Sequence, residues 1–405
     1  MKYYKIVIVM CLLTACSIGL CTNSMGVFYN PVSSSLNVLK GDFALSTTLC
    51  AFSTAFISLN ITRWMQRYKR YNYKKILIIG FILSTLSTYF MAHATTLKMF
   101  YLLGIIRGIG LGTYSTVPVV YILHKWFETK QGFVTSITLS FSGLAGAIFS
   151  PLLNYWIEIY GWQMTYKLMA LCMVILILPV IFISWQEDPK KCGLSAYGQI
   201  VEKERANNEE SNFNLFTFSF ISMGIFTLMH TSITGISQYL SSYSISIGML
   251  SSMGARMMSL VMIGNIAFKF MIGILSDKIG IVKACRIMIN INMVSLLGML
   301  FGSRIQSSLL LYLCAFLFGS IYAVGAVGIP LLTKHFFGAE HYSKTYSVIG
   351  FLTNIGSSLS LILIGYLYDF TKTYQYMFMI AIGIHLVNQI FLIYLNKKVK
   401  KELTE

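Results

Sequence analysis

The chain has 405 residues, of which 56% are hydrophobic and only 11% are charged. A soluble globular domain carries about 25% charged residues, so this composition excludes a soluble enzyme. The formal net charge of +17 would suggest a nucleic-acid partner in a soluble protein. We read it here as a sign of membrane topology, because basic residues collect in cytoplasmic loops.

Apolar segments bounded by charged residues or by Gly, Pro, Asn and Ser clusters recur along the chain. A helix needs about 20 apolar residues to cross a bilayer. The first run imitates a signal peptide but continues to Asn30, so we expect a retained first helix. The prediction is an all-α integral membrane protein with twelve transmembrane helices, at about residues 6–29, 43–62, 76–94, 99–123, 133–157, 164–184, 213–240, 253–275, 285–302, 307–333, 345–368 and 374–395.

The longest polar stretch divides the predicted spans six and six. Pro118 and Pro330 follow similar apolar runs near the ends of spans four and ten, as expected of an internal repeat. The predicted organisation is an N-terminal six-helix bundle over residues 1–184, a cytoplasmic linker over 185–212, a C-terminal six-helix bundle over 213–396 and a cytoplasmic tail over 397–405.

Basic residues gather on one side of the predicted spans, 23 against six on the other side. Both termini and the linker are therefore predicted to be cytoplasmic, in a multi-pass protein of the cell (inner) membrane. The remaining two basic residues, Arg107 and Lys269, lie inside spans, and none of the fourteen acids does. Ionisable residues are costly within a bilayer and mark a transport pathway by default. The pattern therefore disfavours a cationic substrate, because the spans supply no acid to attract it.

Other chemistry has little support in the sequence. The eight cysteines are scattered and form no CxxC pair, so neither a disulfide framework nor a metal site is predicted. No clustered nucleophile or acid pair indicates an enzyme, and we expect no cofactor. His230 and His385 lie in predicted spans and could titrate near neutral pH, although a lone helical histidine is more often a packing residue.

The loop between spans eight and nine contains Gly273, Asp277, Lys278 and Gly280. It resembles the G-x-x-x-D-[RK]-x-G signature of the major facilitator superfamily, which implies twelve helices in two bundles. The resemblance assigns gating to Gly273, where helices approach closely, and to Asp277, Lys278 and Arg286, whose charges pair with the other bundle in one state of a rocking cycle. An ordinary charged loop is the alternative. The matching first-half loop has Arg63 in place of the acid, so a charge-pair gate would depend on the second-half loop.

Four further stretches resemble the monocarboxylate and oxalate/formate branch of that superfamily. They are the residues 26–31 that end span one, the Trp126-Phe127 pair followed by Gly132, the glycine-rich residues 142–151 with Gly161-Trp162, and the linker entry 188–198. Each motif is weak alone, but together with span eight they follow the family's order over most of the chain.

Relatives in that branch place an arginine in span eight, four residues before the motif glycine, where it receives the substrate carboxylate. This chain has Lys269 there and Asn265 one turn earlier. Lys269 lies eight residues before Asp277, about 12 Å along the helix. The alternative is a lysine that extends its charged end to the interface. Asn265 either donates to the substrate or holds the lysine.

Three other residues are candidates for the substrate site. Arg107 either binds substrate or bonds backbone carbonyls at a kinked helix, and Tyr29 and Tyr322 are candidates to line a cavity. The oxalate/formate exchangers carry a second cation in span eleven, where this chain has Gly356. A monoanion is therefore favoured over a dicarboxylate.

The sequence thus predicts a secondary active transporter that moves a small organic anion, a monocarboxylate, by alternating access. Coupling is either to protons or to anion exchange, and Lys269 or the histidines are the groups that could take a proton. We expect the protein to act as a monomer in the lipid bilayer and to bind no nucleic acid. A major facilitator carrier of another small solute, such as a drug or a sugar, is the alternative.

Overall fold

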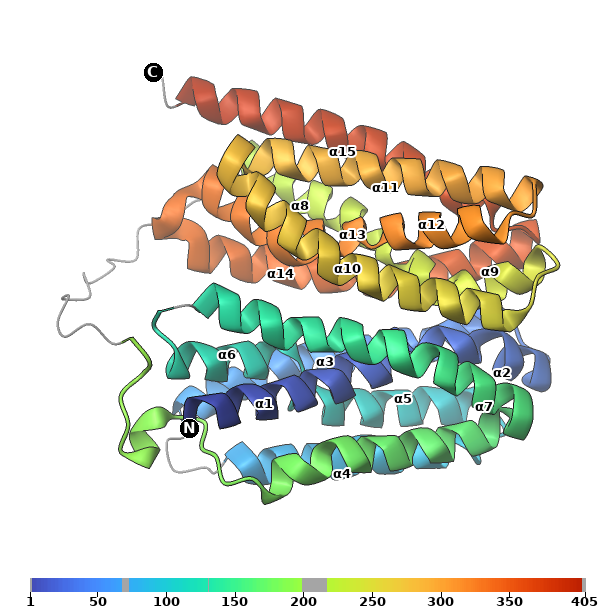
Figure 1. The fold of residues 1–405 in the computed structure, drawn as a ribbon, viewed down its shortest axis with the longest axis horizontal. Helices are drawn as coiled ribbons and strands as arrows, with labels where there is room; N and C mark the ends of the chain where they lie inside the picture. The colour runs from blue at the N-terminus through green and yellow to red at the C-terminus, as the bar shows by residue number, and fades with distance from the viewer. Residues whose placement is uncertain (1, 68–72, 130, 199–216, 403–405) are drawn as a thin grey trace. The chain divides into compact units, whose positions relative to one another are not determined.

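The computed structural model describes residues 2–67, 73–129, 131–198 and 217–402. Within these ranges every regular element is a helix, apart from an isolated β-bridge between Phe127 and Tyr197. Contacts between α-carbons divide the chain into two compact units, Met1–Lys203 and Glu204–Glu405. Each unit is a bundle of helices (Figure 1).

The first unit contains four long helices and several shorter helical pieces. In chain order these are α1 (Lys2–Thr14), the π-helix η1 (Ala15–Asn23), the 3-10 helix η2 (Met25–Phe28), α2 (Tyr29–Leu36), α3 (Lys40–Arg67), α4 (Tyr73–Met91), α5 (Leu97–Gly112), α6 (Thr116–Trp126), α7 (Gln131–Phe182) and the 3-10 helix η3 (Pro189–Cys192).

The glycines of α5 explain why this helix fits between α3 and α4. A Cβ on Gly108 would lie 2.3 Å from the carbonyl oxygen of Cys50 on α3, and one on Gly110 would lie 2.3 Å from the carbonyl oxygen of Gly80 on α4. Small residues allow helix backbones to approach closely in membrane bundles. The glycine-rich run after Arg107 is therefore a packing feature of the bundle.

The second unit has a similar mixture of long and short helices. Its elements are α8 (Phe218–Ser232), the 3-10 helix η4 (Thr234–Tyr239), α9 (Leu240–Ser246), α10 (Ser251–Ile279), α11 (Ile281–Arg304), α12 (Ser308–Phe318), α13 (Ser320–Ala323), the π-helix η5 (Val324–Gly328), α14 (Ile329–Thr371) and α15 (Gln375–Glu402).

Irregular helical turns interrupt four of the apolar segments. In the first unit, π-helical η1 interrupts the first segment, and residues 113–115 separate α5 from α6. In the second unit, η4 separates α8 from α9, and Gly319 with η5 separates α12 from α14. π-helical turns are rare and occur frequently at functional sites. Residues that bond to these breaks are therefore candidates for functional roles.

Ten described segments are long and apolar enough to cross a membrane. One of them, Gly132–Phe182, covers two of the expected spans and turns at Gly161, whose φ of 77° favours glycine. The segment α3 is not among the ten. The expected number of twelve is therefore not confirmed by length and hydropathy.

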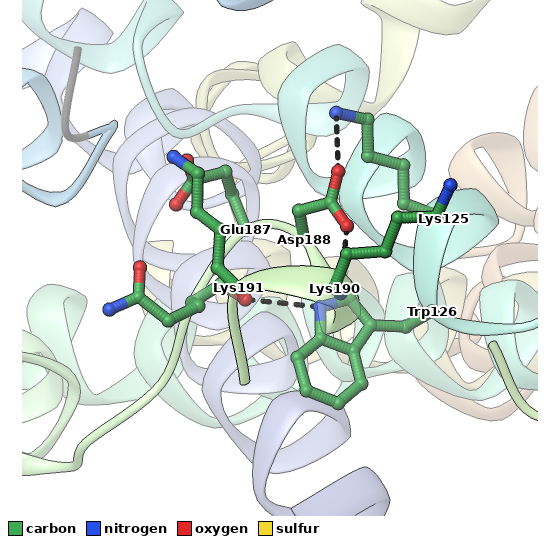
Figure 2. A network of polar contacts seen from close by, with 7 residues as sticks. Lys125, Trp126, Glu187, Asp188, Lys190 and Lys191 are labelled. Carbon is green, nitrogen blue, oxygen red and sulfur yellow. Dashed lines mark hydrogen bonds and ion pairs between the residues drawn. The ribbon is translucent and has the colours of Figure 1, made fainter. Parts of the chain in front are cut away.

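Residues 185–198, which the sequence assigned to the linker, pack against the first unit. Trp126 Nε1 donates to the carbonyl oxygen of Gln186 at 3.0 Å, and Lys125 forms an ion pair with Asp188 at 3.5 Å (Figure 2). The Tyr197 amide donates to the carbonyl oxygen of Trp126 at 2.8 Å. The Trp126-Phe127 and 188–198 motifs are thus in contact. Residues 199–212 of the expected linker lie outside the described residues.

Candidate functional site

Lys269 lies on α10 and is half-buried, between the buried residues Phe268 and Ile272 of the apolar core. Its ammonium group makes no hydrogen bond or ion pair with any residue that the structure describes. An ammonium group in an apolar region is stabilised by a negatively charged or polar partner. Lys269 is therefore a cation without a polar partner among the described residues.

Asn265 lies one turn before Lys269 and is 4% exposed. Its Nδ2 is 3.9 Å from the sulfur of Met262, and its Oδ1 has no partner among the described residues. No hydrogen bond joins this oxygen to Lys269, so the structure provides no support for the expectation that Asn265 holds the lysine. The amide has unused hydrogen-bonding capacity next to the unpaired cation.

Tyr322 belongs to the second unit as well. Its hydroxyl shares a 2.8 Å hydrogen bond with the hydroxyl of Ser237. This bond joins α13 to η4, two short helices at the interruptions described above. The structure therefore gives Tyr322 a contact between broken segments, and α10 packs against the same α13.

Arg107 lies in the first unit and is 2% exposed. Its Nη2 donates to the carbonyl oxygen of Cys21 at 3.1 Å, and its Nη1 lies 3.2 Å from the sulfur of Met25. Its Nε has no partner among the described residues, and no described carboxylate pairs with it. Cys21 belongs to π-helical η1, so Arg107 binds a carbonyl at an irregular helix. This geometry matches the structural alternative.

Tyr29 is fully buried at the start of α2. Its hydroxyl shares a 2.8 Å hydrogen bond with that of Thr47 on α3, and its ring packs edge-on against Phe43. The structure thus places Tyr29 and Arg107 in the first unit, and Lys269, Asn265 and Tyr322 in the second.

Of the gating residues predicted at the end of α10, Asp277 and Lys278 are exposed and Gly273 is half-buried. Asp277 and Lys278 make no ion pair with any described residue. A Cβ on Gly273 would have nothing within 4 Å. The close helix approach expected at Gly273 stays a prediction.

Arg286 bonds within the second unit, and its expected pairing with the other bundle stays a prediction. Its Nε donates to Oε1 of Gln389 at 2.9 Å, and Nε2 of Gln389 donates to the carbonyl oxygen of Arg286 at 3.0 Å and to Oδ1 of Asn290 at 2.8 Å. These bonds tie α11 to α15.

One polar cluster, which the structure forms from side chains of three helices, was not predicted from the sequence. His230 on α8 and His385 on α15 have ring centroids 5.9 Å apart, and His385 bonds Asn292 of α11. The sequence treats the two histidines as separate packing residues. Asn292 and Asn388, both polar and both inside apolar spans, were the available signal.

The described residues contain no group of three or more His, Cys, Asp or Glu side chains that could hold a metal ion.

The chain is similar to known transporters in sequence and in fold. A family model described as the Major Facilitator Superfamily matches residues 10–360 and 215–405. The uncharacterized MFS-type transporter YhjX of Escherichia coli (strain K12) is 22% identical over 334 residues, 82% of this chain and 80% of the relative. Monocarboxylate transporter 12 of Rattus norvegicus is 24% identical over 336 residues, 75% of this chain and 68% of the relative.

Solved structures match over nearly the full length. The nucleoside transporter NupG superimposes with a TM-score of 0.76 at 14% identity, covering 98% of this chain and 100% of its own. A bacterial homolog to the human lysosomal transporter Spinster, in an inward-facing and unoccupied conformation, superimposes with a TM-score of 0.75 at 12% identity, covering 99% and 98%. At such identities the likeness concerns the fold alone.

Proposed function

The chain belongs to the major facilitator superfamily, and from this premise we propose that it transports a small organic anion, a monocarboxylate, across the bilayer by alternating access. Membership makes it a multi-pass membrane transporter with an all-helical fold, and it confirms the resemblance seen in the residues. The observation that carries the choice of substrate is Lys269, a cation that no described residue neutralises.

A carboxylate supplies the negatively charged partner that Lys269 lacks among the described residues. The lysine ammonium acts as a point charge with three donors and has no bidentate fork, so it suits one carboxylate without selecting strongly for its plane. Asn265 has an unpaired amide oxygen one turn away, and a rotated amide would offer its NH₂ group to a substrate oxygen. A single anion therefore uses both residues.

The names of relatives support the same substrate class, since several are described as monocarboxylate transporter 12. The absence of a second cation at Gly356 favours a monoanion over a dicarboxylate. We assign coupling to protons in preference to anion exchange, because the second unit contains Lys269, His230 and His385, whose side chains can take up a proton.

The proposal includes twelve spans and cytoplasmic termini in the cell membrane, with the monomer as the active form. The twelve spans are the ten candidate segments, with Gly132–Phe182 counted as two spans on either side of Gly161, together with α3. The excess of basic residues on one side supports the orientation.

An uptake screen in proteoliposomes tests this function. Radiolabelled lactate, pyruvate, formate, acetate and oxalate are compared with uridine and glucose, with and without an inward proton gradient. We expect at least one monocarboxylate to accumulate faster than oxalate and both neutral solutes, and the gradient to accelerate its entry. Uptake confined to a neutral solute would contradict the anion assignment, and anion uptake that needs internal anion and ignores the gradient would indicate exchange.

A further inference from the structure

A buried polar cluster lies inside the second unit, among the core residues of α8, α11 and α15. Its members are His230, Asn292, His385 and Asn388, and each is 0% exposed. The two imidazole rings have centroids 5.9 Å apart and planes inclined by 53°. The transport site proposed above does not include these residues.

The neighbours of each histidine determine which ring nitrogen carries the proton. His230 Nε2 lies 3.1 Å from the carbonyl oxygen of Ile321, and because a carbonyl can only accept, Nε2 is the donor. Asn292 donates from Nδ2 to the carbonyl oxygen of Phe318 at 2.9 Å, which leaves its Oδ1 to accept from His385 Nε2 at 2.9 Å. Both neutral rings are therefore Nε2–H tautomers.

This assignment leaves a lone pair on Nδ1 of both rings. Neither Nδ1 has a partner among the described residues, and the same is true of both amide atoms of Asn388, one turn from His385. Buried polar atoms normally have hydrogen-bond partners. The Phe226 ring stacks on His230 at 5.8 Å with an angle of 18°, a position that stabilises a positive charge on the imidazole.

We propose that His230 and His385 form a binding site for one proton. The proton adds to an Nδ1 lone pair and makes that ring an imidazolium, with its Nε2–H still bonded to Ile321 or Asn292. Two positive rings 5.9 Å apart in an apolar interior would repel each other, so the pair takes one proton and titrates as a unit.

No acid is bonded to either ring among the described residues. Besides the two histidines, the titratable or charged residues on the neighbouring helices are Lys283, Cys285, Arg286 and Arg304 on α11, Tyr322 on α13, Arg256, Lys269, Asp277 and Lys278 on α10, and Tyr376, Tyr394, Lys397, Lys398, Lys400, Lys401 and Glu402 on α15. Where α14 packs on α8 around Gly356, residues 347–365 contain no titratable side chain. No described carboxylate contacts either ring. The charge of the bound proton is therefore not cancelled locally by a fixed anion.

A single turn of backbone connects this pair to the helix of Lys269. A Cβ on Gly319 would lie 2.4 Å from the backbone nitrogen of Asn265, so α10 rests directly on that glycine. Phe318 and Ile321, on either side of Gly319, accept the hydrogen bonds from Asn292 and His230. Residues 318–321 thus have the proton site on one side and the anion-binding helix on the other.

In the proposed anion transport, the His230 and His385 pair binds the coupled proton. This part of the proposal rests on the proposed function. A proton on the pair strengthens the bonds to residues 318–321, because a charged donor makes a stronger hydrogen bond. An anion at Lys269 acts on the same backbone through α10. The two ligands thereby favour the same conformation of the second unit.

The proton itself is the probe in the first test, which needs no substrate. The reconstituted protein is labelled with ¹⁵N-histidine, and the His230 and His385 signals are assigned with the His230→Gln and His385→Gln variants. We expect two Nε2–H tautomers at about pH 8 and conversion of one ring to imidazolium as the pH is lowered. Two rings that stay neutral throughout, or two that both become imidazolium, would overturn the proposal.

Transport supplies the second test. Both glutamine variants and the exposed control His93→Gln are compared in proteoliposomes with the monocarboxylate that gives the highest uptake in the screen. We expect His230→Gln and His385→Gln to lose at least about tenfold of the gradient-driven uptake and to keep anion exchange within about twofold, with His93→Gln unchanged. Retained gradient-driven uptake would overturn the proposal. If the wild type moves no anion, the proposed function fails, and the histidine spectra still decide the proton site.

Discussion

Arg107 and Lys269 are both basic residues in apolar segments, but their surroundings differ. The Arg107 guanidinium is almost fully buried and donates to the carbonyl oxygen of Cys21. The Lys269 ammonium has no partner among the described residues. Removing the two charges should therefore change the stability of the protein differently, since Arg107 bonds an irregular helix and Lys269 bonds no described residue.

We expect Arg107→Gln to destabilise the protein by about 1–3 kcal/mol, because the Cys21 carbonyl loses a charged donor within a buried region. The measurement is the thermal unfolding midpoint of detergent-purified protein in anion-free buffer. Lys269→Gln is the matched control and should leave the midpoint unchanged or raise it, since no hydrogen bond is lost. A rise in the midpoint for Arg107→Gln would instead assign that cation to a ligand.

The sequence predicts the existence of both cations and the lack of acids around them, because each residue type and each apolar run can be read directly. It does not separate their roles. The separation depends on η1, where the backbone winds as a π-helix and presents the Cys21 carbonyl to Arg107. No residue pattern in that segment specifies a π-helical turn.

Individual elements of the second unit meet at Gly319. The backbone nitrogen of Asn265 would lie 2.4 Å from a Cβ at this position, and the carbonyl carbon of Gly264 would lie 2.5 Å from it. Both atoms belong to the α10 backbone and cannot rotate away. The contact between α10 and residues 318–321 therefore depends on a glycine at position 319, because glycine has no Cβ.

We expect Gly319→Ala to destabilise the second unit by more than about 2 kcal/mol, because overpacking against backbone forces a helix to move. Gly383→Ala is the matched control, since a Cβ there meets nothing within 4 Å, and it should be neutral or stabilising by up to about 1 kcal/mol. Thermal unfolding midpoints of the two variants decide the matter. Equal midpoints would show that α10 does not depend on this close contact.

Element positions follow the hydropathy pattern well. The segment expected at 285–302 is α11, and the segment expected at 253–275 is α10, each a few residues longer in the structure. The breaks within segments are less predictable, because they depend on tertiary contacts such as Tyr322 with Ser237. The His230 and His385 pair was missed for the same reason, since the two residues are 155 positions apart and meet only through helix packing.

At the scale of the whole molecule, the linker entry belongs to the first unit. Residues 185–198 are fixed to the end of α6 by Trp126 and by the ion pair of Lys125 with Asp188 (Figure 2). In the second unit, Asp277 is exposed and unpaired among the described residues. A charge in that condition is available for a contact formed in another state of the cycle.

We expect Asp277→Asn to lower the maximal uptake rate about tenfold and to change the half-saturating substrate concentration less than about twofold. In the gating role that the resemblance implies, the loop would act on reorientation of the carrier, which is a conformational step, and not on substrate binding. Uptake kinetics in proteoliposomes measure both quantities. A parallel loss of affinity would argue against a purely conformational role for this residue.

The central claim is that the transported anion is neutralised by Lys269, and one comparison tests it most directly. Initial uptake of the preferred monocarboxylate is measured in proteoliposomes containing the wild type, Lys269→Gln, Lys269→Arg or the exposed control Lys283→Gln. We expect Lys269→Gln to lose at least about tenfold of the uptake, equivalent to about 1.4 kcal/mol or more. We expect Lys269→Arg to retain part of it, and Lys283→Gln to match the wild type. Undiminished uptake by a folded Lys269→Gln protein would contradict the account.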